Sequence, residues 1–184
     1  MSSPATEAPP RQRLFLALWP DEAVRRRLIR ERDLAAAACR GRPVAPDNLH
    51  ITLVFLGASD GPQRACAERA AGEVKAPAFR LMLERVGYWS RPRVVWLGSD
   101  GVPASLSALV GALQQGLAGC GYTLEERPFR PHITLLRKVP PRPRFKPRLD
   151  EPVEWPVTHF HLVESVTRST GAEYRLVATW PLSG

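Results

Sequence analysis

The sequence carries the four residues His-Ile-Thr-Leu twice, at positions 50–53 and again at positions 132–135. Each copy lies in a run of apolar and β-branched residues, 49–56 and 129–136, and such runs predict short strands. Two matching strands indicate two similar half-structures that face each other across a groove.

Each motif strand is expected to have one polar and one apolar face, because alternate side chains of a strand share a face. In the first copy the polar face holds His50 and Thr52, and the core face holds Ile51, Leu53 and Phe55. The second copy places His132 and Thr134 opposite Ile133 and Leu135. A single such pair is more often solvated or satisfied in the core, but the repetition favours a functional role.

The length and charge of the chain suit a single domain with an anionic partner. At 184 residues it predicts one domain over residues 13–184, with two lobes, after a disordered tail at residues 1–12. The 26 basic and 18 acidic residues give a net charge of +8, which favours nucleic acid first and a membrane surface second. No apolar run reaches membrane-spanning length, so we expect no membrane insertion.

The cysteines predict neither a disulfide framework nor a zinc site, because Cys39, Cys66 and Cys120 are odd in number and far apart. Cys66 is interpreted as a core residue. This cysteine usage is typical of a reducing compartment, and we expect a cytoplasmic protein.

Hydrophobic patterning predicts three helices. The first begins after an Asp21 cap, the second opens at Pro62, and the third starts at Pro103. The expected inward residues are Val24, Leu28 and Ile29 in the first, Cys66, Ala70 and Val74 in the second, and Leu106, Leu109, Val110, Leu113 and Leu117 in the third.

The remaining strands are expected at residues 14–19, 79–89, 93–98, 153–166 and 174–180, with 79–98 forming a hairpin. The proline-rich stretch 139–152 is predicted to be an extended surface loop outside the sheet. Its arginines, and those on the helix after Asp21, either contact RNA or are simply solvated, and solvation is the more common role of such residues.

His159 and His161 share a face of one predicted strand. A His-x-His pair can ligate a metal ion, but no further ligand lies at a supporting spacing. A polar strand face is therefore favoured, and we expect no metal site.

Two histidines without a serine nucleophile signature suit general acid–base catalysis, since imidazole titrates near neutrality. A neutral ring removes a proton from water, and a protonated ring delivers one to the departing oxygen. The two threonine hydroxyls can donate hydrogen bonds to phosphate oxygens. The set predicts in-line cleavage of a phosphodiester without a metal ion or other cofactor.

Several stretches extend the motifs: Arg13 to Leu18, Asp47 to His50, Arg127 to Phe129 and Pro131 to His132, and Arg93 to Gly98. With them the chain closely resembles the two-histidine (2H) phosphoesterases. The resemblance is to the branch of RNA 2′,3′-cyclic phosphodiesterases, also called LigT-like 2′-5′ RNA ligases.

The resemblance implies an α+β fold that is bilobal and pseudo-two-fold symmetric, with antiparallel sheets lining a central cleft and helices on the outside. It implies that His132 is the proton acceptor for water and His50 the proton donor to the 3′ oxygen, which leaves a 2′-phosphate. Thr52 and Thr134 would bind phosphate oxygens.

Two further substrate-binding residues follow from the resemblance. Arg137 would add charge to the phosphate site, although strict alternation puts it on the face opposite His132, so a bulge or strand end is required. Phe15 would either stack on a base or be an ordinary core residue.

The expected function is therefore hydrolysis of terminal 2′,3′-cyclic phosphates on RNA by a monomer. Reversible, ATP-independent 2′-5′ ligation is the same chemistry with a 5′-hydroxyl in place of water. The alternatives are a phosphodiesterase for another diester, such as 2′-5′ oligoadenylate or an ADP-ribose cyclic phosphate, and a non-catalytic protein that binds RNA ends.

Overall fold

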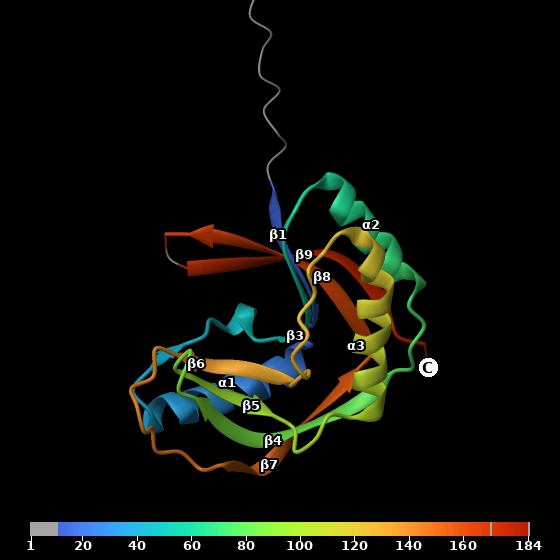
Figure 1. The fold of residues 1–184 in the computed structure, drawn as a ribbon. Helices are drawn as coiled ribbons and strands as arrows, with labels where there is room; N and C mark the ends of the chain where they lie inside the picture. Colours follow the sequence, from blue (N-terminus) through green and yellow to red (C-terminus); the bar gives the residue numbers. More distant parts are fainter. Residues whose placement is uncertain (1–10, 170, 184) are drawn as a thin grey trace, which may run out of the picture.

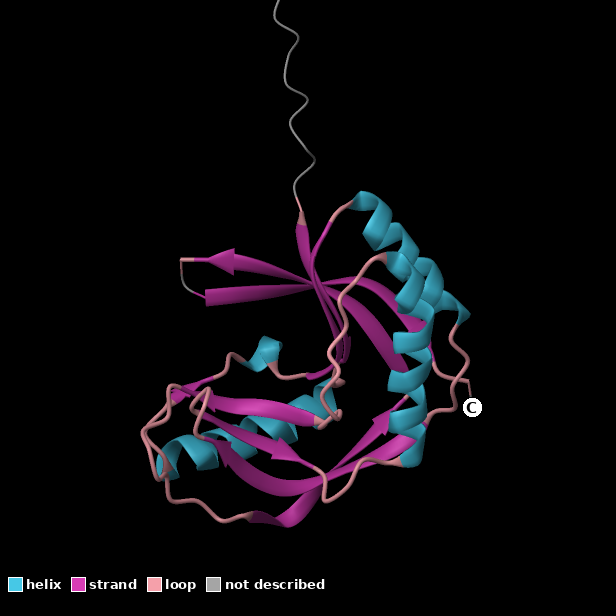
Figure 2. Ribbon diagram, viewed as in Figure 1, coloured by secondary structure: helices cyan, strands magenta, loops and turns pink. Residues whose placement is uncertain are grey.

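A computed structural model describes residues 11–169 and 171–183. Its helices are α1 (Glu22–Ala38), α2 (Gly61–Glu73) and α3 (Ala104–Leu117), with short 3-10 turns η1 (Pro46–Asn48) and η2 (Ala118–Cys120). Its strands are β1 (Gln12–Leu18), β2 (Arg42–Pro43), β3 (Ile51–Ser59), β4 (Phe79–Trp89), β5 (Val94–Gly98), β6 (His132–Arg137), β7 (Arg148–Val157), β8 (His159–Arg168) and β9 (Gly171–Pro181). The predicted α+β class is confirmed (Figures 1 and 2).

The two motif strands lie at the centre of the sheet. The described strands pair antiparallel in the order β7-β4-β5-β6-β3-β1-β8-β9, with β2 beside β6. Ile51 of β3 pairs with Ile133 of β6, and this pair joins one half of four strands to another of four strands plus the short β2, with the motif strand innermost in each row. The pairing order gives no rotation axis, so the pseudo-two-fold symmetry stays a prediction.

The helices pack on the outside of the two halves, as Figure 2 shows. Helix α1 contacts β6 and β7, while α2 and α3 pack on each other and contact β9 and β3 respectively. The predicted Asp21 cap is confirmed, because its carboxylate accepts a hydrogen bond from Val24 N. All five apolar residues predicted inside α3 are buried.

Both motif strands contain a β-bulge at the motif leucine. Strand β1 pairs with Thr52 and then with Val54, so Leu53 is the extra residue in β3. Strand β5 skips Leu135 of β6 in the same way. A bulge shifts the alternation of faces by one residue. Beyond each bulge, side chains that simple alternation assigns to the core therefore turn to the polar face.

The bulge in β3 overturns one expectation. Phe55 was predicted to share the core face with Ile51, but it is 44% exposed, and Val54 is buried in its place. The sequence pattern was misleading here because alternation holds only as long as the strand stays regular.

Strand β7 corrects the interpretation of the proline-rich stretch. The segment 139–152 was predicted to lie outside the sheet, but β7 begins at Arg148, includes Pro152 and pairs with β4. It has only β4 as a neighbour among the described strands, and an edge strand tolerates proline because one side needs no N–H donors. The single strand expected over 153–166 is instead divided at Thr158 into β7 and β8.

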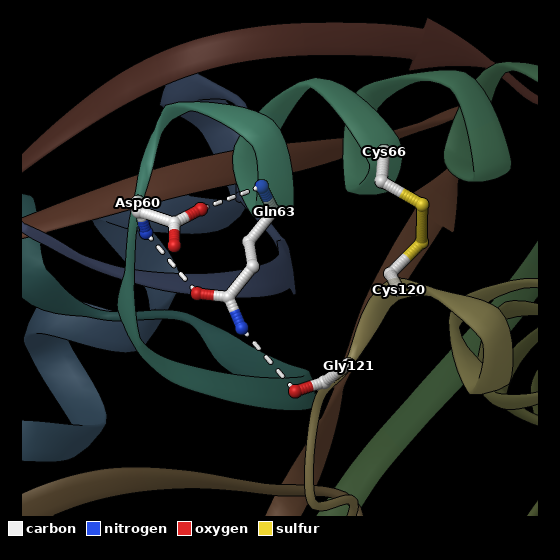
Figure 3. The surroundings of a disulfide bond; sticks show 5 residues. All are labelled: Asp60, Gln63, Cys66, Cys120 and Gly121. Atoms are coloured by element: carbon white, nitrogen blue, oxygen red, sulfur yellow. Dashed lines mark hydrogen bonds between the residues drawn. A yellow bond between two sulfur atoms is a disulfide. The ribbon is translucent and has the colours of Figure 1, made fainter.

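A disulfide joins Cys66 of α2 to Cys120 at the end of η2 (Figure 3). The Cα atoms are 5.6 Å apart. The expectation of no disulfide was therefore wrong, since an odd number of cysteines still allows one pair. Cys66 is not buried in the core, and α2 instead buries Ala67 and Ala71.

The same end of α2 is fixed by polar contacts. Asp60 and Gln63 form a reciprocal capping box, and Gln63 Nε2 also donates to Gly121 O at 3.2 Å (Figure 3). Two independent links thus hold α2 to the chain that follows α3.

The expected 1–12 tail falls largely outside the described residues, but Gln12 is the first residue of β1. None of the described helices is long and apolar enough to cross a membrane.

We predict that a Cys66→Ser/Cys120→Ser variant unfolds with a free energy about 2–4 kcal/mol lower than the wild type, because the disulfide constrains a loop of more than fifty residues in the unfolded chain. Urea denaturation without reductant measures the difference. Dithiothreitol should destabilise the wild type and leave the variant unchanged. Equal stability of the two proteins without reductant would contradict the prediction.

Candidate active site

The Ile51–Ile133 pair brings the two motifs to one place. Both isoleucines point into the core, so the neighbouring polar residues of each motif share the opposite face. A pocket of ≈ 210 Å³ opens there. It is lined by His50, Thr52, His132, Thr134, Arg137, Asn48, Trp89, Pro92, Val94 and Tyr174.

The two histidine rings are held in the same way. His50 Nδ1 lies 2.7 Å from Asn48 O, and His132 Nδ1 lies 2.9 Å from Arg130 O. A carbonyl can only accept, so each Nδ1 carries a hydrogen and Nε2 holds the lone pair of the neutral ring. Thr52 Oγ1, 3.1 Å from His50 Nε2, donates to that lone pair. Each ring is therefore oriented to exchange a proton through Nε2.

Arg137 lines the pocket although simple alternation predicts the opposite face. The bulge at Leu135 explains this, because it restores Arg137 to the face of His132 and Thr134. The structure thus contains the bulge that this placement required, and it adds a permanent positive charge to the pocket.

Three aromatic rings surround His50. Trp19 stacks on it at 5.2 Å between ring centroids with 13° between the planes, and Tyr174 meets it edge-on at 5.2 Å. Phe15 lies 5.1 Å away and is only 4% exposed. Of the two roles expected for Phe15, its burial favours the core one, because a ring this covered offers no face to a base.

His132 contacts the ring of Trp89, which in turn packs against a second tryptophan. Trp89 contacts His132 edge-on at 4.5 Å, and Trp96 lies 5.3 Å from Trp89. Trp96 covers Gly87 so closely that a Cβ there would come within 2.1 Å of the indole. A glycine at position 87 is therefore needed for this stack, and the stack fixes the wall beside His132.

Asn48 connects the first motif to the β8–β9 hairpin, which projects from the sheet in Figure 1. Its Nδ2 donates to Ala172 O at 2.8 Å, two residues before the pocket residue Tyr174. Sequence reasoning missed Asn48, Trp19, Trp89 and Tyr174 as site residues. Their only signal was position, Asn48 just before a motif and the aromatics in predicted strands, and only the tertiary pairing of those strands reveals the contacts.

Comparison with known proteins agrees with this geometry. The model of the 2′-5′ RNA ligase superfamily matches residues 19–168. The chain belongs to this superfamily.

Two relatives can be aligned with the chain over nearly its full length. It is 36% identical over 178 residues to the RNA 2′,3′-cyclic phosphodiesterase of Escherichia coli strain K12, covering 94% of this chain and 97% of that protein. It is 33% identical over 189 residues to the protein of that name from Thermus thermophilus, covering 94% and 91%.

Solved structures show the same fold. Escherichia coli LigT in complex with 3′-AMP superposes with a TM-score of 0.87 at 36% identity, covering 95% of this chain and 99% of that one. The protein TT0787 of Thermus thermophilus gives a TM-score of 0.78 at 31% identity, covering 94% and 98%. The resemblance to the two-histidine phosphoesterases is therefore confirmed.

Both pocket histidines have a pKa below the ordinary value of an imidazole. Burial lowers the pKa of His50 to about 4, and the charges of His132 and Arg137 act in the same direction against the hydrogen bond to Asn48 O. The pKa of His132 is also lowered, first by burial and then by Arg137. A positively charged pocket with neutral imidazoles is prepared to receive an anion.

A second pocket of ≈ 370 Å³ is lined by Trp19 and includes His159 and His161. His161 Nδ1 lies 2.9 Å from Thr179 Oγ1, and His159 Nδ1 lies 2.9 Å from Thr158 Oγ1. Within the described ranges, no three His, Cys, Asp or Glu side chains are grouped so that they could hold a metal ion.

We predict that Arg137→Ala raises the pKa of His50 above its value of about 4, because the substitution removes a positive charge that opposes protonation, and that the pKa stays below 6.5 because burial, the largest cause, is unchanged. Titration of the ligand-free protein by imidazole ¹⁵N NMR measures this pKa directly. Arg80→Ala, on the exposed pair with Glu154, is the matched control and should leave it unchanged. A His50 pKa that does not move in Arg137→Ala would show that the guanidinium does not act on the ring.

Proposed function

We propose that this protein hydrolyses terminal 2′,3′-cyclic phosphates of RNA to 2′-phosphates by acid–base catalysis, without a metal ion. The observation that carries the proposal is the convergence of two imidazoles, one from each half of the sheet, on one pocket that also holds Arg137. The names of the relatives support the same substrate class.

The reaction is a single in-line displacement. His132 Nε2 accepts a proton from water as the water oxygen forms a bond to phosphorus. The bond from phosphorus to O3′ breaks, and protonated His50 donates its Nε2 proton to that oxygen. The product carries a 3′-hydroxyl and a 2′-phosphate. The orientation of both rings by backbone carbonyls supports proton transfer through Nε2.

The remaining polar groups bind the phosphate. Thr52 and Thr134 donate hydroxyl hydrogen bonds to the non-bridging oxygens, and the Arg137 guanidinium balances their charge. Trp89 and Tyr174 form side walls against which the terminal nucleoside packs. The threonine hydroxyls and the guanidinium stabilise the negative charge that the phosphate oxygens carry throughout the displacement.

The division of roles between the two histidines follows the family resemblance. The acid must carry a proton in the complex, although burial lowers the pKa of His50 to about 4. The bound phosphate anion raises that pKa, and the stacked face of Trp19 adds a cation–π contribution in the same direction.

The proposed partners are RNA ends, and the net charge of +8 favours their binding. Ligation through a 2′-5′ linkage follows if a 5′-hydroxyl replaces water. A monomeric state and a cytoplasmic location stay predictions. The Cys66–Cys120 disulfide removes the reason that cysteine usage gave for the cytoplasm.

We predict that His50→Ala and His132→Ala each lower kcat by roughly 10²–10⁴-fold, since each removes one proton transfer. The assay follows an oligonucleotide 2′,3′-cyclic phosphate by ³¹P NMR in the presence of EDTA, and the wild type should produce the 2′-monophosphate. His159→Ala, a histidine outside this pocket, serves as the matched control and should retain activity. Binding without turnover by the wild type, or turnover only after metal is added, would contradict the proposal.

We also predict a bell-shaped pH dependence whose basic limb moves on substrate binding. In the free enzyme both histidine pKa values lie below 6.5, so kcat/KM should fall above that pH as the last shared proton is lost. A bound phosphate anion favours the imidazolium and raises the pKa of His50, so the basic limb of kcat should lie at higher pH. Coincident basic limbs, or a rate still rising at alkaline pH, would exclude the paired scheme.

A further inference from the structure

Phe55 is an exposed aromatic ring on the same face of β3 as Thr52, and His50 lies just before that strand. The bulge at Leu53 turns it away from the core and leaves it 44% exposed. The guanidinium carbon of Arg13, on neighbouring β1, lies 4.7 Å from the ring centroid. An exposed ring paired with an arginine is the combination with which proteins stack single-stranded nucleic acid bases.

The position of Phe55 corresponds to that of Arg137. Each lies five residues after its motif histidine, and each reaches the polar face through a bulge at the motif leucine. Arg137 contributes to the phosphate pocket, but Phe55 is not among the pocket residues. The equivalent position in the other half therefore continues the polar face beyond the pocket.

The chain on the other side of β3 extends this surface. The segment 121–131 begins near the N-terminus of α2, where Gly121 O accepts from Gln63, and ends at His132. Because β3 and β6 are antiparallel at Ile51–Ile133, the segment follows β3 in the opposite direction, as Figure 1 shows. It delivers the exposed Arg130 just before the second motif.

We propose that Phe55 and Arg13 bind the nucleotide that precedes the terminal one in an RNA substrate. Its base stacks on the Phe55 ring, and Arg13 contacts its phosphate. This inference rests on the proposed function and assigns the substrate as a polynucleotide end rather than a mononucleotide.

The spacing suits this assignment. Thr52 pairs with Ala17 and Phe55 with Phe15, so the bulge leaves them two strand steps apart, roughly 7 Å at the rise of a strand. In an RNA that ends in a 2′,3′-cyclic phosphate, the preceding nucleotide is attached to the 5′ oxygen of the terminal nucleoside. That nucleotide needs a binding surface outside the pocket of ≈ 210 Å³. Stacking on an aromatic ring is tolerant of base identity, so we expect little sequence preference there.

The experiment compares two substrates, adenosine 2′,3′-cyclic phosphate and a trinucleotide ending in the same group. Phe55→Ala should lower kcat/KM for the trinucleotide about tenfold and leave the mononucleotide unchanged, as expected for the loss of one stacked base. Phe55→Leu keeps an apolar side chain without a π face and should show the same loss. Phe55→Trp should retain activity on both substrates.

Arg13→Ala should also reduce activity on the trinucleotide alone, and the loss should shrink as salt is raised. Leu34→Ala removes a comparably exposed apolar side chain from α1 and is the matched control. Melting temperatures of the variants test their folding.

Equal losses on both substrates would overturn the proposal, because Phe55 would then act through its β1 neighbour Phe15, which contacts His50. No loss on either substrate would overturn it as well. Hydrolysis of the mononucleotide by the wild type tests the proposed function separately.

Discussion

The candidate site depends on the contact between Ile51 and Ile133. Both side chains are fully buried, and burial of an isoleucine contributes about 1.5–3 kcal/mol. Their pairing is the point at which the two motif strands join, and it sets the register of the motifs. The pair places the polar residues that flank each isoleucine, His50 and Thr52 on one strand and His132 and Thr134 on the other, around the same pocket.

Burial of these rings also controls their charge. Apolar and aromatic surroundings exclude water from His50, and the nearby guanidinium adds to the cost of a second cation. The ligand-free pocket therefore carries its positive charge on Arg137, where it is permanent, and leaves the imidazoles neutral. In the proposed mechanism the phosphate supplies the negative charge that lets one imidazole become protonated, so that substrate binding and protonation of the acid are coupled.

The repeated motif was enough to predict both strands, the polar face and the four residues that meet there. The Asp21 cap and the buried stripe of α3 were also predictable, because they depend on local spacing. The bulges at Leu53 and Leu135 were not, since they are visible only in the pairing with β1 and β5, and they decide where Phe55 and Arg137 point. The aromatic neighbours of the histidines come from strands distant in sequence. The disulfide and the proline-containing edge strand depend in the same way on tertiary proximity and on place in the sheet.

The motif is duplicated, but its surroundings are not. His50 is enclosed by three aromatic rings, whereas His132 contacts Trp89 in a T-shaped arrangement. Two chemically identical groups therefore have different surroundings, and the opposite roles proposed for them depend on the neighbouring strands. Divergence of those neighbours after an internal duplication would be sufficient to give such a molecule its polarity, with no change in the motif itself.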